Sequence, residues 1–458
     1  MEWCGVNRVL VQVHPREASR RRSRRRLLAS VGVLLAGALV LTGCGSSGAT
    51  SGGGNGGTGT KEFTFWSMWT KNEPVAKVLQ QAIASFQQQT GVKVHVQWEG
   101  RDSMTKLKAA LNTDNVPDLI DQGFTSVAAT LGSGQALDLT SVYAMKTGDD
   151  GSGATIRQEV PTGYDHLDTT NNKLILVPYY VSADTWWFNE NAYPDLVSSP
   201  PTTWSQFTSF VDSVKAQGQN PIAQDSDILF YDGSLVYGAL ERALGPGNLH
   251  KLAADHSGNA WDDPKVKTAI DAIASLASGH DFIPGYDASK YPAMEKDWAH
   301  GKAALLYMGS WVPYYDGPDA GKNFKLGTFN FPTLGSNDHS VPTSTFGFAI
   351  PTKAKNGPAA KKFIAYMMSK KWLTELSQQA QVLTPNSDIP VPDSLKALQA
   401  VLKDNPVYPD HDNVDADYPN LDQRFQPLFR DLVTGKLSAS AFIAQAKSVQ
   451  QQYWKLNG

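Results

Sequence analysis

Apolar residues recur through most of this chain at the spacings of short strands and amphipathic helices. Between Val75 and Gln89 they return every three or four positions and line one face, which predicts a helix. Phe63–Trp66 before it and Val92–Trp98 after it have the apolar or alternating pattern of buried strands. Because strands and helices alternate in this way, we expect parallel α/β layers.

The same pattern continues from Lys61 to the C-terminus. Further helices are expected at Met104–Leu111, Trp204–Ala216, Lys265–Ala277, Pro358–Ser369 and throughout Leu421–Gly458. Further strands are expected at Asp118–Ile120, Leu174–Val177, Ala303–Met308 and Gly347–Ile350. The segment Asp225–Gly233 reads as a loop of polar and aromatic residues. A body of about 400 residues predicts two domains.

The N-terminus has a basic stretch followed by an apolar one. Six arginines stand between positions 20 and 26, and 13 apolar or small residues follow at Ala29–Leu41. An apolar run of this length is typical of a secretory signal and is shorter than the ~20 residues of a spanning helix. Small residues then lead to Cys44, which predicts a lipoprotein signal at 1–43 with a lipid on the Cys44 thiol. The alternative is a cleaved signal followed by an incidental cysteine.

The export route and the segment after Cys44 follow from the same region. Ser23–Leu28 resembles a twin-arginine export signal, and the general secretory route remains open. Between Gly45 and Thr60 the chain holds eight Gly, three Ser and three Thr, so residues 44–60 are predicted to form a flexible tether. We therefore expect an extracytoplasmic protein that is lipid-anchored to the cell membrane.

Charge and cysteine content narrow the class of protein. Loss of residues 1–43 removes eight Arg and two Glu, which takes the formal net charge from −3 to −9. An acidic protein is not expected to bind nucleic acid. Cys4 and Cys44 are the two cysteines, so the body is expected to fold outside the cell without disulfides.

Metal and cofactor signals are weak. Asp410–Asp417 is similar to a calcium loop, but Val414 stands where an oxygen ligand is needed and no glycine follows. The histidines lack zinc-ligand spacing, so neither a metal nor a cofactor is expected.

Six motifs occur in a fixed order along the body. They are Phe65–Trp69, Val116–Ile120, Val177–Tyr180 with Trp187–Asn189, Pro201–Trp204, Gly301–Ala304 with Met308–Trp311, and Phe346–Pro351. Together they resemble extracellular solute-binding proteins of family 1, the sugar receptors of ABC importers, of which maltodextrin-binding proteins are the familiar case. The likeness covers the chain from about residue 61 to its C-terminus.

The resemblance implies an α/β, two-lobe, type II periplasmic-binding-protein fold with hinge strands between the lobes. It places lobe 1 at 61–180 and 346–384, and lobe 2 at 181–345 and 385–458. It also implies a non-enzymatic monomer that captures a sugar or oligosaccharide between the lobes and delivers it to ABC permease subunits. The permease and ATPase are expected to be separate chains, because the sequence has no P-loop motif.

Aromatic residues are the leading candidates for sugar contact, because a flat ring can cover the C–H face of a sugar. By resemblance, Trp311 lies against a sugar ring at the lobe interface; the alternative is a buried lobe anchor. Trp69 stands just past the first strand, where open α/β sheets gather ligands, and Tyr180 belongs to the first crossover.

Further candidates are polar or aromatic residues at strand ends and in loops. Gln122 and Phe124 follow the strand at Asp118–Ile120, and Ser182 and Asp184 follow the first crossover. The family often has a carboxylate at the Ser182 position, where this chain has a hydroxyl.

Two more candidates come from the segment Asp225–Gly233, which resembles the second lobe's sugar loop and contributes Tyr231 and Asp232. Arg424 is a candidate from the C-terminal helices, with a surface ion pair as its alternative. For Trp69 the alternative is a core position. A solvated loop residue is the alternative for Gln122, Phe124, Ser182, Asp184, Tyr231 and Asp232.

Two other classes of protein remain open at this stage. A secreted glycoside hydrolase would also carry many aromatics, with a pair of carboxylates about 5–10 Å apart. A receptor for a charged solute, such as glycerol phosphate or a polyamine, is the second. Phosphate would require clustered cations, for which only Lys71 and Arg424 are placed, whereas an acidic cleft would suit a polyamine.

Overall fold

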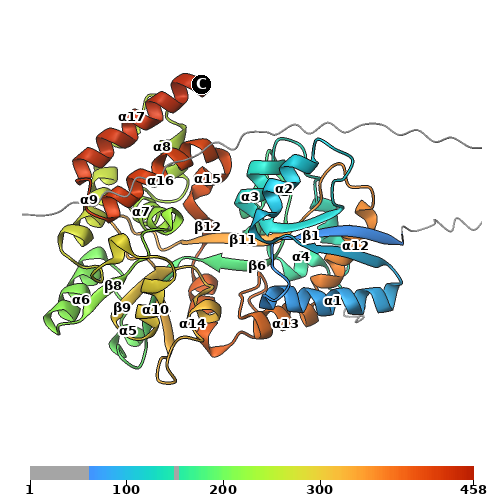
Figure 1. The fold of residues 1–458 in the computed structure, drawn as a ribbon, viewed down its shortest axis with the longest axis horizontal. Helices are drawn as coiled ribbons and strands as arrows, with labels where there is room; N and C mark the ends of the chain where they lie inside the picture. The colour runs from blue at the N-terminus through green and yellow to red at the C-terminus, as the bar shows by residue number, and fades with distance from the viewer. Residues whose placement is uncertain (1–60, 149–153) are drawn as a thin grey trace, which may run out of the picture. The chain divides into compact units, whose positions relative to one another are not determined.

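The computed structural model describes residues 61–148 and 154–458, which belong to one compact unit. The predicted signal, Cys44 and the tether lie outside the described residues. Within the described part the strands form two larger sheets and one short hairpin, β4 (Thr169–Thr170) with β5 (Lys173–Leu174). Helices pack on both larger sheets (Figure 1), but each sheet contains antiparallel as well as parallel pairs, so the predicted parallel layers are present only in part.

The first sheet has the order β12-β11-β3-β1-β2, with β6 paired to β11. Its strands are β1 (Glu62–Ser67), β2 (Lys93–Trp98), β3 (Leu119–Gly123), β6 (Val177–Ala183), β11 (Val341–Ala349) and β12 (Val407–Pro409). β1 runs parallel to β2 and β3, so their carboxyl ends meet at one edge. The helices of this part are α1 (Pro74–Thr90), α2 (Ser103–Ala110), α3 (Phe124–Leu131), α4 (Ile156–Glu159), α12 (Gly357–Met367) and α13 (Lys370–Ala380).

Helix α1 shows why the sequence pattern succeeds in this region. Its buried face is made by Val75, Val78, Leu79, Ala82, Ile83 and Phe86. Pro74 occupies the first turn, where its missing N–H costs nothing, and Gly91 ends the helix in the left-handed conformation at φ 69°. Phe63 and Phe65 of β1 pack under this face together with Phe363 of α12.

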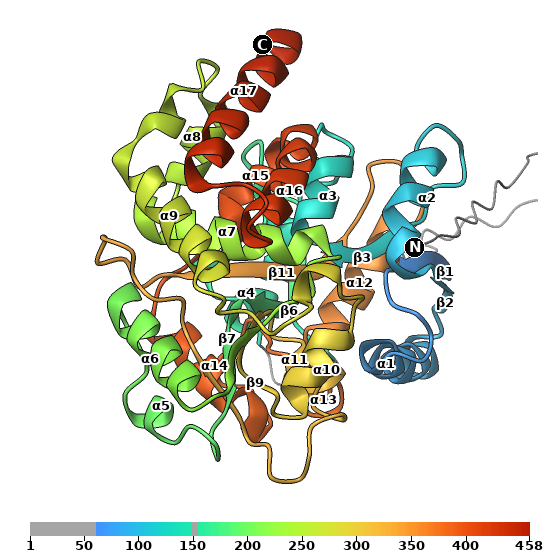
Figure 2. The same cartoon turned by 60° about the vertical axis from the view of Figure 1, so that its left-hand side comes forward.

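The second sheet has the order β10-β7-β9-β8. Its strands are β7 (Thr185–Asn189), β8 (Asn220–Ala223), β9 (Ala303–Met308) and β10 (Leu326–Phe329). The remaining helices, several of which are visible in Figure 2, are α5 (Asp195–Ser198), α6 (Trp204–Ala216), α7 (Leu229–Leu244), α8 (Asn248–Ala254), α9 (Pro264–Ser278), α10 (Ala293–Ala299), α11 (Val312–Tyr315), α14 (Asp393–Asp404), α15 (Val414–Asp417), α16 (Pro419–Val433) and α17 (Ala439–Asn457). A second core forms here around Trp186, Phe207 and Trp261.

Strands β6 and β11 connect the two parts of the described chain. They pair antiparallel, with Phe346 opposite Tyr180, and lie side by side in Figure 1. Tyr180 packs in the core beneath β1, whereas the next residue, Val181, packs with Trp187 and Leu306 of the second sheet. The chain therefore passes from one core to another between two adjacent residues of β6.

Gly347 allows β6 and β11 to approach closely. A Cβ atom at this position would lie 2.3 Å from the Val177 carbonyl oxygen and 2.7 Å from the Pro178 Cα. Both neighbours are backbone atoms and cannot move without distorting the pair. We therefore expect Gly347→Ala to lower the free energy of unfolding by ~3 kcal/mol, the upper end for an overpacked position. The shift of the urea unfolding midpoint measures this change.

Gly163→Ala is the matched control for that substitution. The same added Cβ at Gly163 meets no atom within 4 Å, so its unfolding midpoint should stay at the wild-type value. Equal midpoints for both variants would show that the close approach at Gly347 is not constrained.

Most predicted elements are present, and four differ. The strand predicted at Leu174–Val177 is interrupted, because Ile175 hydrogen-bonds to the Asp168 carbonyl and ladder pairing resumes only at Val177. β11 begins before Gly347, at Val341. The C-terminal region is two helices, α16 and α17, separated at Gly435, whose φ is 72°.

The fourth difference concerns the predicted loop Asp225–Gly233. Helix α7 already begins at Leu229, so Tyr231 and Asp232 lie in its first turn. The prediction of a loop there was wrong, because these polar and aromatic residues open a helix whose buried residues Leu235, Val236 and Leu240 lie further along the chain.

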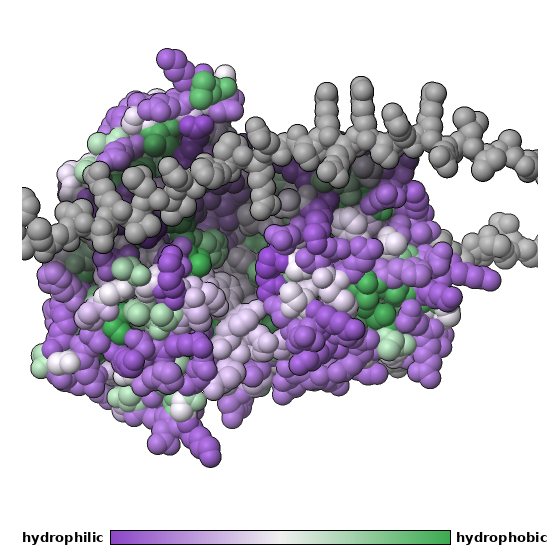
Figure 3. Space-filling view, in the orientation of Figure 1, coloured by the Kyte–Doolittle hydropathy of each residue, from purple (hydrophilic) through white to green (hydrophobic). Residues whose placement is uncertain are grey.

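On the face shown in Figure 3, hydrophilic residues predominate and hydrophobic ones are scattered. Among the described residues, the large apolar or aromatic side chains that are exposed are Val197, Phe230, Tyr291, Tyr315 and Leu456. Within the same part of the chain, every helix is too short or too polar to cross a bilayer.

Candidate ligand-binding site

An aromatic cavity of about 510 Å³ lies where the two parts of the described chain meet. Its lining residues are Met68, Trp69, Arg101, Tyr180, Ile228, Phe230, Tyr231, Tyr291, Trp311, Tyr315 and Phe346. The volume falls within the ~300–1,000 Å³ of small-molecule sites. Trp69, Tyr180, Tyr231 and Trp311, all predicted as ligand contacts, come together here.

The exposed aromatic residues concentrate in this cavity. Phe230, Tyr291 and Tyr315 are three of the five large apolar or aromatic side chains exposed in the described part of the chain, and all three line it. Exposed rings gathered at one concave place mark a binding site more often than chance exposure does.

A chain of buried hydrogen bonds fixes Trp69. Its indole Nε1 donates to the Tyr179 hydroxyl at 2.8 Å, and that hydroxyl donates to Asp121 Oδ2 at 2.9 Å. Asp121 also accepts the Met68 backbone N–H at 2.8 Å and the Ser67 hydroxyl at 3.1 Å. Burial nevertheless raises the pKa of Asp121 to about 6. Ser67, Met68 and Trp69 lie at the carboxyl end of β1, and their partners Asp121 and Tyr179 lie on β3 and β6, so three strands of the first sheet hold the Trp69 ring at the sheet edge.

Tyr180 and Phe346 form a stacked pair on the crossing strands. Their ring centroids are 4.9 Å apart with an interplanar angle of 16°. The Trp69 ring lies 6.4 Å from Tyr180 and 6.5 Å from Phe346. These three rings make a continuous aromatic wall on the side of the first sheet.

The loop after β9 holds Trp311 on the opposite side. A Cβ at Gly309 would come within 2.1 Å of the Trp311 ring, so only glycine lets the indole lie across that backbone. The Ser310 hydroxyl and backbone N–H both donate to the Ser182 hydroxyl, at 2.9 and 3.3 Å. Ser182, predicted as a ligand contact, is itself buried and instead anchors the Trp311 loop to β6.

Tyr231 and Tyr291 form the remaining wall, with ring centroids 6.0 Å apart. The pKa values of both phenols are raised, mainly by burial and secondly by the nearby carboxyl of Glu295. The pKa of Tyr291 is raised to about 12. Glu295 and Asp316 are buried and share a hydrogen bond. Burial and the Asp316 charge raise the pKa of Glu295 to about 9, so Glu295 is the protonated donor of this pair at neutral pH.

Arg101 is the only charged side chain among the residues that line the cavity. Its guanidinium lies 4.8 Å from the Trp69 ring centroid, which suits a cation–π contact. It also forms an ion pair with Glu73 at 2.5 Å and donates to the Met68 carbonyl at 2.8 Å. The cavity wall therefore carries a cation whose charge is already balanced.

Gln122 and Phe124, both predicted as ligand contacts, lie outside the cavity lining. The Gln122 amide donates to the Ser103 hydroxyl at 3.2 Å and accepts the Gly123 backbone N–H at 2.9 Å. Phe124 packs in an apolar cluster with Leu107 and Val127. Both residues lie near the end of β3, as predicted. Their side chains, however, bond to or pack against other residues of the first-sheet part and do not reach the cavity.

Asp232 and Arg424 are likewise absent from the lining. Asp232 is buried and accepts from the Gln224 amide at 3.0 Å; burial raises its pKa to about 7. Arg424 is exposed on α16, with its guanidinium 6.0 Å from the Tyr453 ring centroid.

Asp184 belongs to a buried charged cluster behind the crossing strands. Asp184, Asp410 and His411 each bring one possible ligand atom within 4.8 Å of the others. The Ser344 hydroxyl donates to Asp410 at 3.0 Å, and His411 Nδ1 lies 3.5 Å from Asp415. Despite the opposing effect of burial, these carboxylates raise the pKa of His411, so its imidazolium supplies a cation within the cluster.

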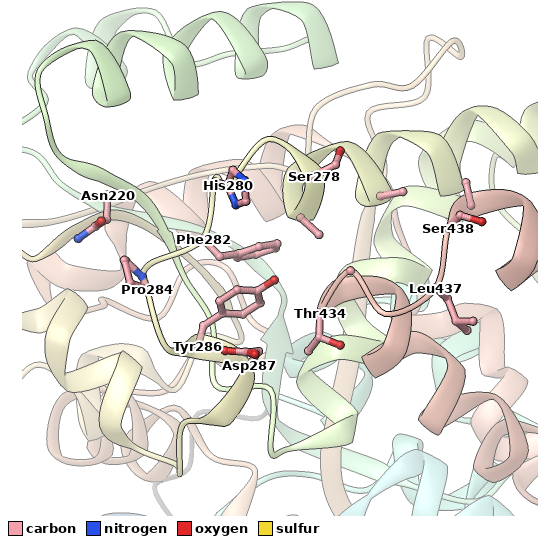
Figure 4. A pocket seen from close by; sticks show the side chains of 14 residues that line it. Asn220, Ser278, His280, Phe282, Pro284, Tyr286, Asp287, Thr434, Leu437 and Ser438 are labelled. Carbon is pink, nitrogen blue, oxygen red and sulfur yellow. The ribbon is translucent and has the colours of Figure 1, made fainter. Parts of the chain in front are cut away.

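A second cavity, of about 790 Å³, lies entirely in the part of the chain around α9 and the start of α17 (Figure 4). Phe282 and Tyr286 stack there with ring centroids 4.6 Å apart, and the Tyr286 hydroxyl donates to the Val433 carbonyl at 3.0 Å. No residue of the first sheet lines this second cavity, so a ligand bound in it would not contact both parts of the chain.

The sequence analysis missed seven lining residues: Met68, Arg101, Ile228, Phe230, Tyr291, Tyr315 and Phe346. Five of them carried usable signals. Arg101 follows the carboxyl end of β2, the same position that drew attention to Trp69. Met68 and Phe346 lie in the first and last motifs, and Ile228 and Phe230 lie in the segment Asp225–Gly233. Tyr291 and Tyr315 come from segments brought in by tertiary packing.

Two α/β parts joined by crossing strands, with a cavity where they meet, define a two-lobe periplasmic-binding-protein fold of type II. A solved structure of apo RafE from Streptococcus pneumoniae has this fold, with a TM-score of 0.71 at 18% identity, covering 87% of this chain and 99% of that one. A structure of RafE in complex with raffinose gives a TM-score of 0.66, also at 18% identity, over 86% and 99% of the two chains.

Residues 81–403 match the family model of bacterial extracellular solute-binding proteins, and this chain belongs to that family. The predicted resemblance is therefore confirmed. A probable sugar-binding periplasmic protein of Rhizobium meliloti is 26% identical over 215 residues, which are 46% of this chain and 49% of that relative. The chain thus spans about half the length of such curated relatives. The family and these relatives are binding proteins rather than enzymes.

Proposed function

We propose that this chain is the membrane-anchored, extracellular substrate-binding component of an ABC importer, and that it captures a sugar or oligosaccharide. The main support for this proposal is the aromatic cavity between the two parts of the chain. One part contributes Trp69, Tyr180 and Phe346, and the other contributes Trp311, Tyr231 and Tyr291. The names of the matched relatives, probable sugar-binding periplasmic proteins, agree with this ligand class.

Aromatic walls suit a sugar for a physical reason. If one ring covers ~60 Å² of a sugar's C–H face, burial stabilises the complex by about 1.5 kcal/mol at ~25 cal/mol/Å². A micromolar complex needs about 8 kcal/mol, so several rings must act together with partners for the hydroxyl groups. The phenol groups of Tyr231, Tyr291 and Tyr315 and the Arg101 guanidinium supply such partners around the cavity.

The rival ligand classes fit the cavity less well. A glycoside hydrolase needs two carboxyl groups on the two sides of the scissile bond, and no Asp or Glu is among the residues that line this cavity. A phosphorylated solute needs unpaired cations, whereas the single lining cation, Arg101, is paired with Glu73. A polyamine would need carboxylates on the wall, and the nearby Glu295 and Asp316 are absent from the lining.

The proposed cycle uses two lobes, 61–180 with 346–384 and 181–345 with 385–458. The change of core between Tyr180 and Val181 supports a hinge on β6 and β11. A ligand that touches both lobes favours the closed form by the contacts it gains there. The closed receptor, a monomer held near the membrane by a lipid on Cys44, would then dock on separate permease subunits and release the sugar.

Six of the predicted contact residues would support this site indirectly or lie outside it: Gln122, Phe124, Ser182, Asp184, Asp232 and Arg424.

Binding of purified protein to defined solutes tests the proposal. A thermal-shift and calorimetry panel would contain galactose, raffinose, maltotriose and chitotriose, with glycerol 3-phosphate and spermidine as representatives of the charged classes. We expect saturable binding of at least one neutral sugar, recovered unchanged by chromatography after incubation. Binding only of the phosphate or the polyamine, or release of shorter sugars, would contradict the proposal.

A further inference from the structure

The Tyr315 hydroxyl lies at the rim of the cavity and bonds to two residues of the other part of the chain. Tyr315 ends α11, four residues after Trp311, and therefore belongs with the second sheet. Its hydroxyl donates to Glu73 Oε1 at 3.0 Å and accepts from Arg101 at 3.2 Å. Glu73 precedes α1 and Arg101 follows β2, so both belong with the first sheet.

Glu73 and Arg101 are also held by hydrogen bonds within the first-sheet part of the chain. Arg101 contacts Glu73 through both terminal nitrogens, at 2.5 and 3.3 Å, and also donates to the Met68 carbonyl. Glu73 Oε2 accepts the Thr70 backbone N–H at 2.5 Å and the Thr70 hydroxyl at 2.9 Å. Although burial opposes it, these donors hold the pKa of Glu73 below its ordinary value, so the carboxylate stays ionised.

The Tyr315 hydroxyl therefore contacts one ionic acceptor and one ionic donor, both of which are held by other residues as well. Hydrogen bonds to charged groups are stronger than those between neutral groups. The contact also continues into the ligand wall, because the same guanidinium stacks on Trp69, and Tyr315 itself lines the cavity.

We propose that Tyr315, with the Glu73–Arg101 pair, forms a latch across the cleft that stabilises the closed form and thereby sets affinity for the ligand. This inference rests on the proposed function, because it assumes that closure accompanies ligand capture. The latch stabilises the closed form whether or not ligand is present. Its loss should therefore lower the closed fraction of the free protein and also weaken ligand binding.

The test compares Tyr315→Phe with Tyr314→Phe in ligand-free protein. The first variant removes one hydroxyl and keeps the ring. Tyr314 is the matched control, since it neighbours Tyr315 with ring centroids 4.6 Å apart and no hydrogen bond of its hydroxyl is found within the described residues. Small-angle X-ray scattering should give a larger radius of gyration for Tyr315→Phe and the wild-type value for Tyr314→Phe.

Glu73→Gln and the double variant make the test specific to the latch. Glu73→Gln should shift the radius of gyration in the same direction, and adding Tyr315→Phe should shift it by less than it does in wild type, because the Tyr315–Glu73 contact is already weakened and the Arg101 bond is what remains to be lost. Thermal midpoints of all four variants show whether each remains folded. Identical radii for the folded wild type, Tyr315→Phe and Glu73→Gln would overturn the latch.

Titration with raffinose tests whether the latch affects ligand affinity. If wild-type protein binds it, Tyr315→Phe should weaken the Kd by roughly 3- to 10-fold, mainly through faster dissociation, while Tyr314→Phe keeps the wild-type Kd. Failure of the wild type to bind raffinose would count against that ligand and not against the latch, because the scattering comparison needs no ligand.

Discussion

Trp311→Ala is expected to weaken sugar binding at least tenfold while the protein still folds. The indole lines the cavity opposite Trp69, and removing a ring that covers ~60 Å² of sugar surface costs about 1.5 kcal/mol or more. Because Trp311 is only partly buried, its loss leaves no closed void in a core. Calorimetric titration with the best sugar of the panel measures the loss, and the thermal midpoint reports on folding.

Trp454→Ala is the matched control, since it removes the same ring from α17. Trp454 is partly buried, donates to the Ala253 carbonyl at 3.0 Å and stacks on His256, away from the cavity lining. Its loss should lower stability slightly and leave sugar affinity at the wild-type value. Equal affinities for both variants would mean that Trp311 anchors its loop and does not contact the ligand.

Glu295→Gln is expected to flatten the pH dependence of stability. Burial raises the pKa of Glu295 from its ordinary 4.5 to about 9, and the Asp316 carboxyl adds to the shift. Between these two values the folded state keeps a proton that the unfolded chain has lost, so stability falls as pH rises through this window. The slope from one such proton approaches ~1.4 kcal/mol per pH unit. Glutamine keeps a donor for Asp316 without the titration.

Thermal midpoints at pH 6 and pH 8.5 measure this effect. The drop across that interval should be smaller in Glu295→Gln than in wild type, with part of it retained because the pKa values of Asp184 and Asp232 are also raised by burial, to about 7. Asp393→Asn is the control, since Asp393 is exposed and its pKa is lowered by Lys396, below this window. Equal drops in wild type and Glu295→Gln would show that Glu295 is ionised in the folded protein.

Elements whose signals lie within one segment could be predicted from the sequence. Helix α1 has its own apolar period, with Pro74 and Gly91 at its ends, and strand β1 has its own alternating pattern, so no distant residue is needed to define them. The start of α7 was missed for the opposite reason. Its first turn, residues 229–232, has no side-chain cap, and the residues that Gly233 lies against, Phe429 and Gln426 of α16, are far away in the sequence.

The candidate site was predicted in part. Trp69 could be found because parallel strands present their carboxyl ends together, and Trp311 because its motif carries the glycine on which the ring rests. Tyr291 and Tyr315 could not, since nothing in their neighbouring sequence says which surface they approach. Asp184 shows the converse, because a residue next to a crossover can turn toward a buried ion cluster instead of the ligand.

On the second-sheet side, the wall of the cavity is built from side chains at helix ends and in connecting loops, whereas Met68, Trp69 and Tyr180 on the other side belong to a core. Exchange of Phe230, Tyr291 or Trp311 would therefore alter which guest is accepted without disturbing Phe65, Trp186 or the other interior rings. A few substitutions at these positions could therefore give receptors for different solutes on one unchanged scaffold.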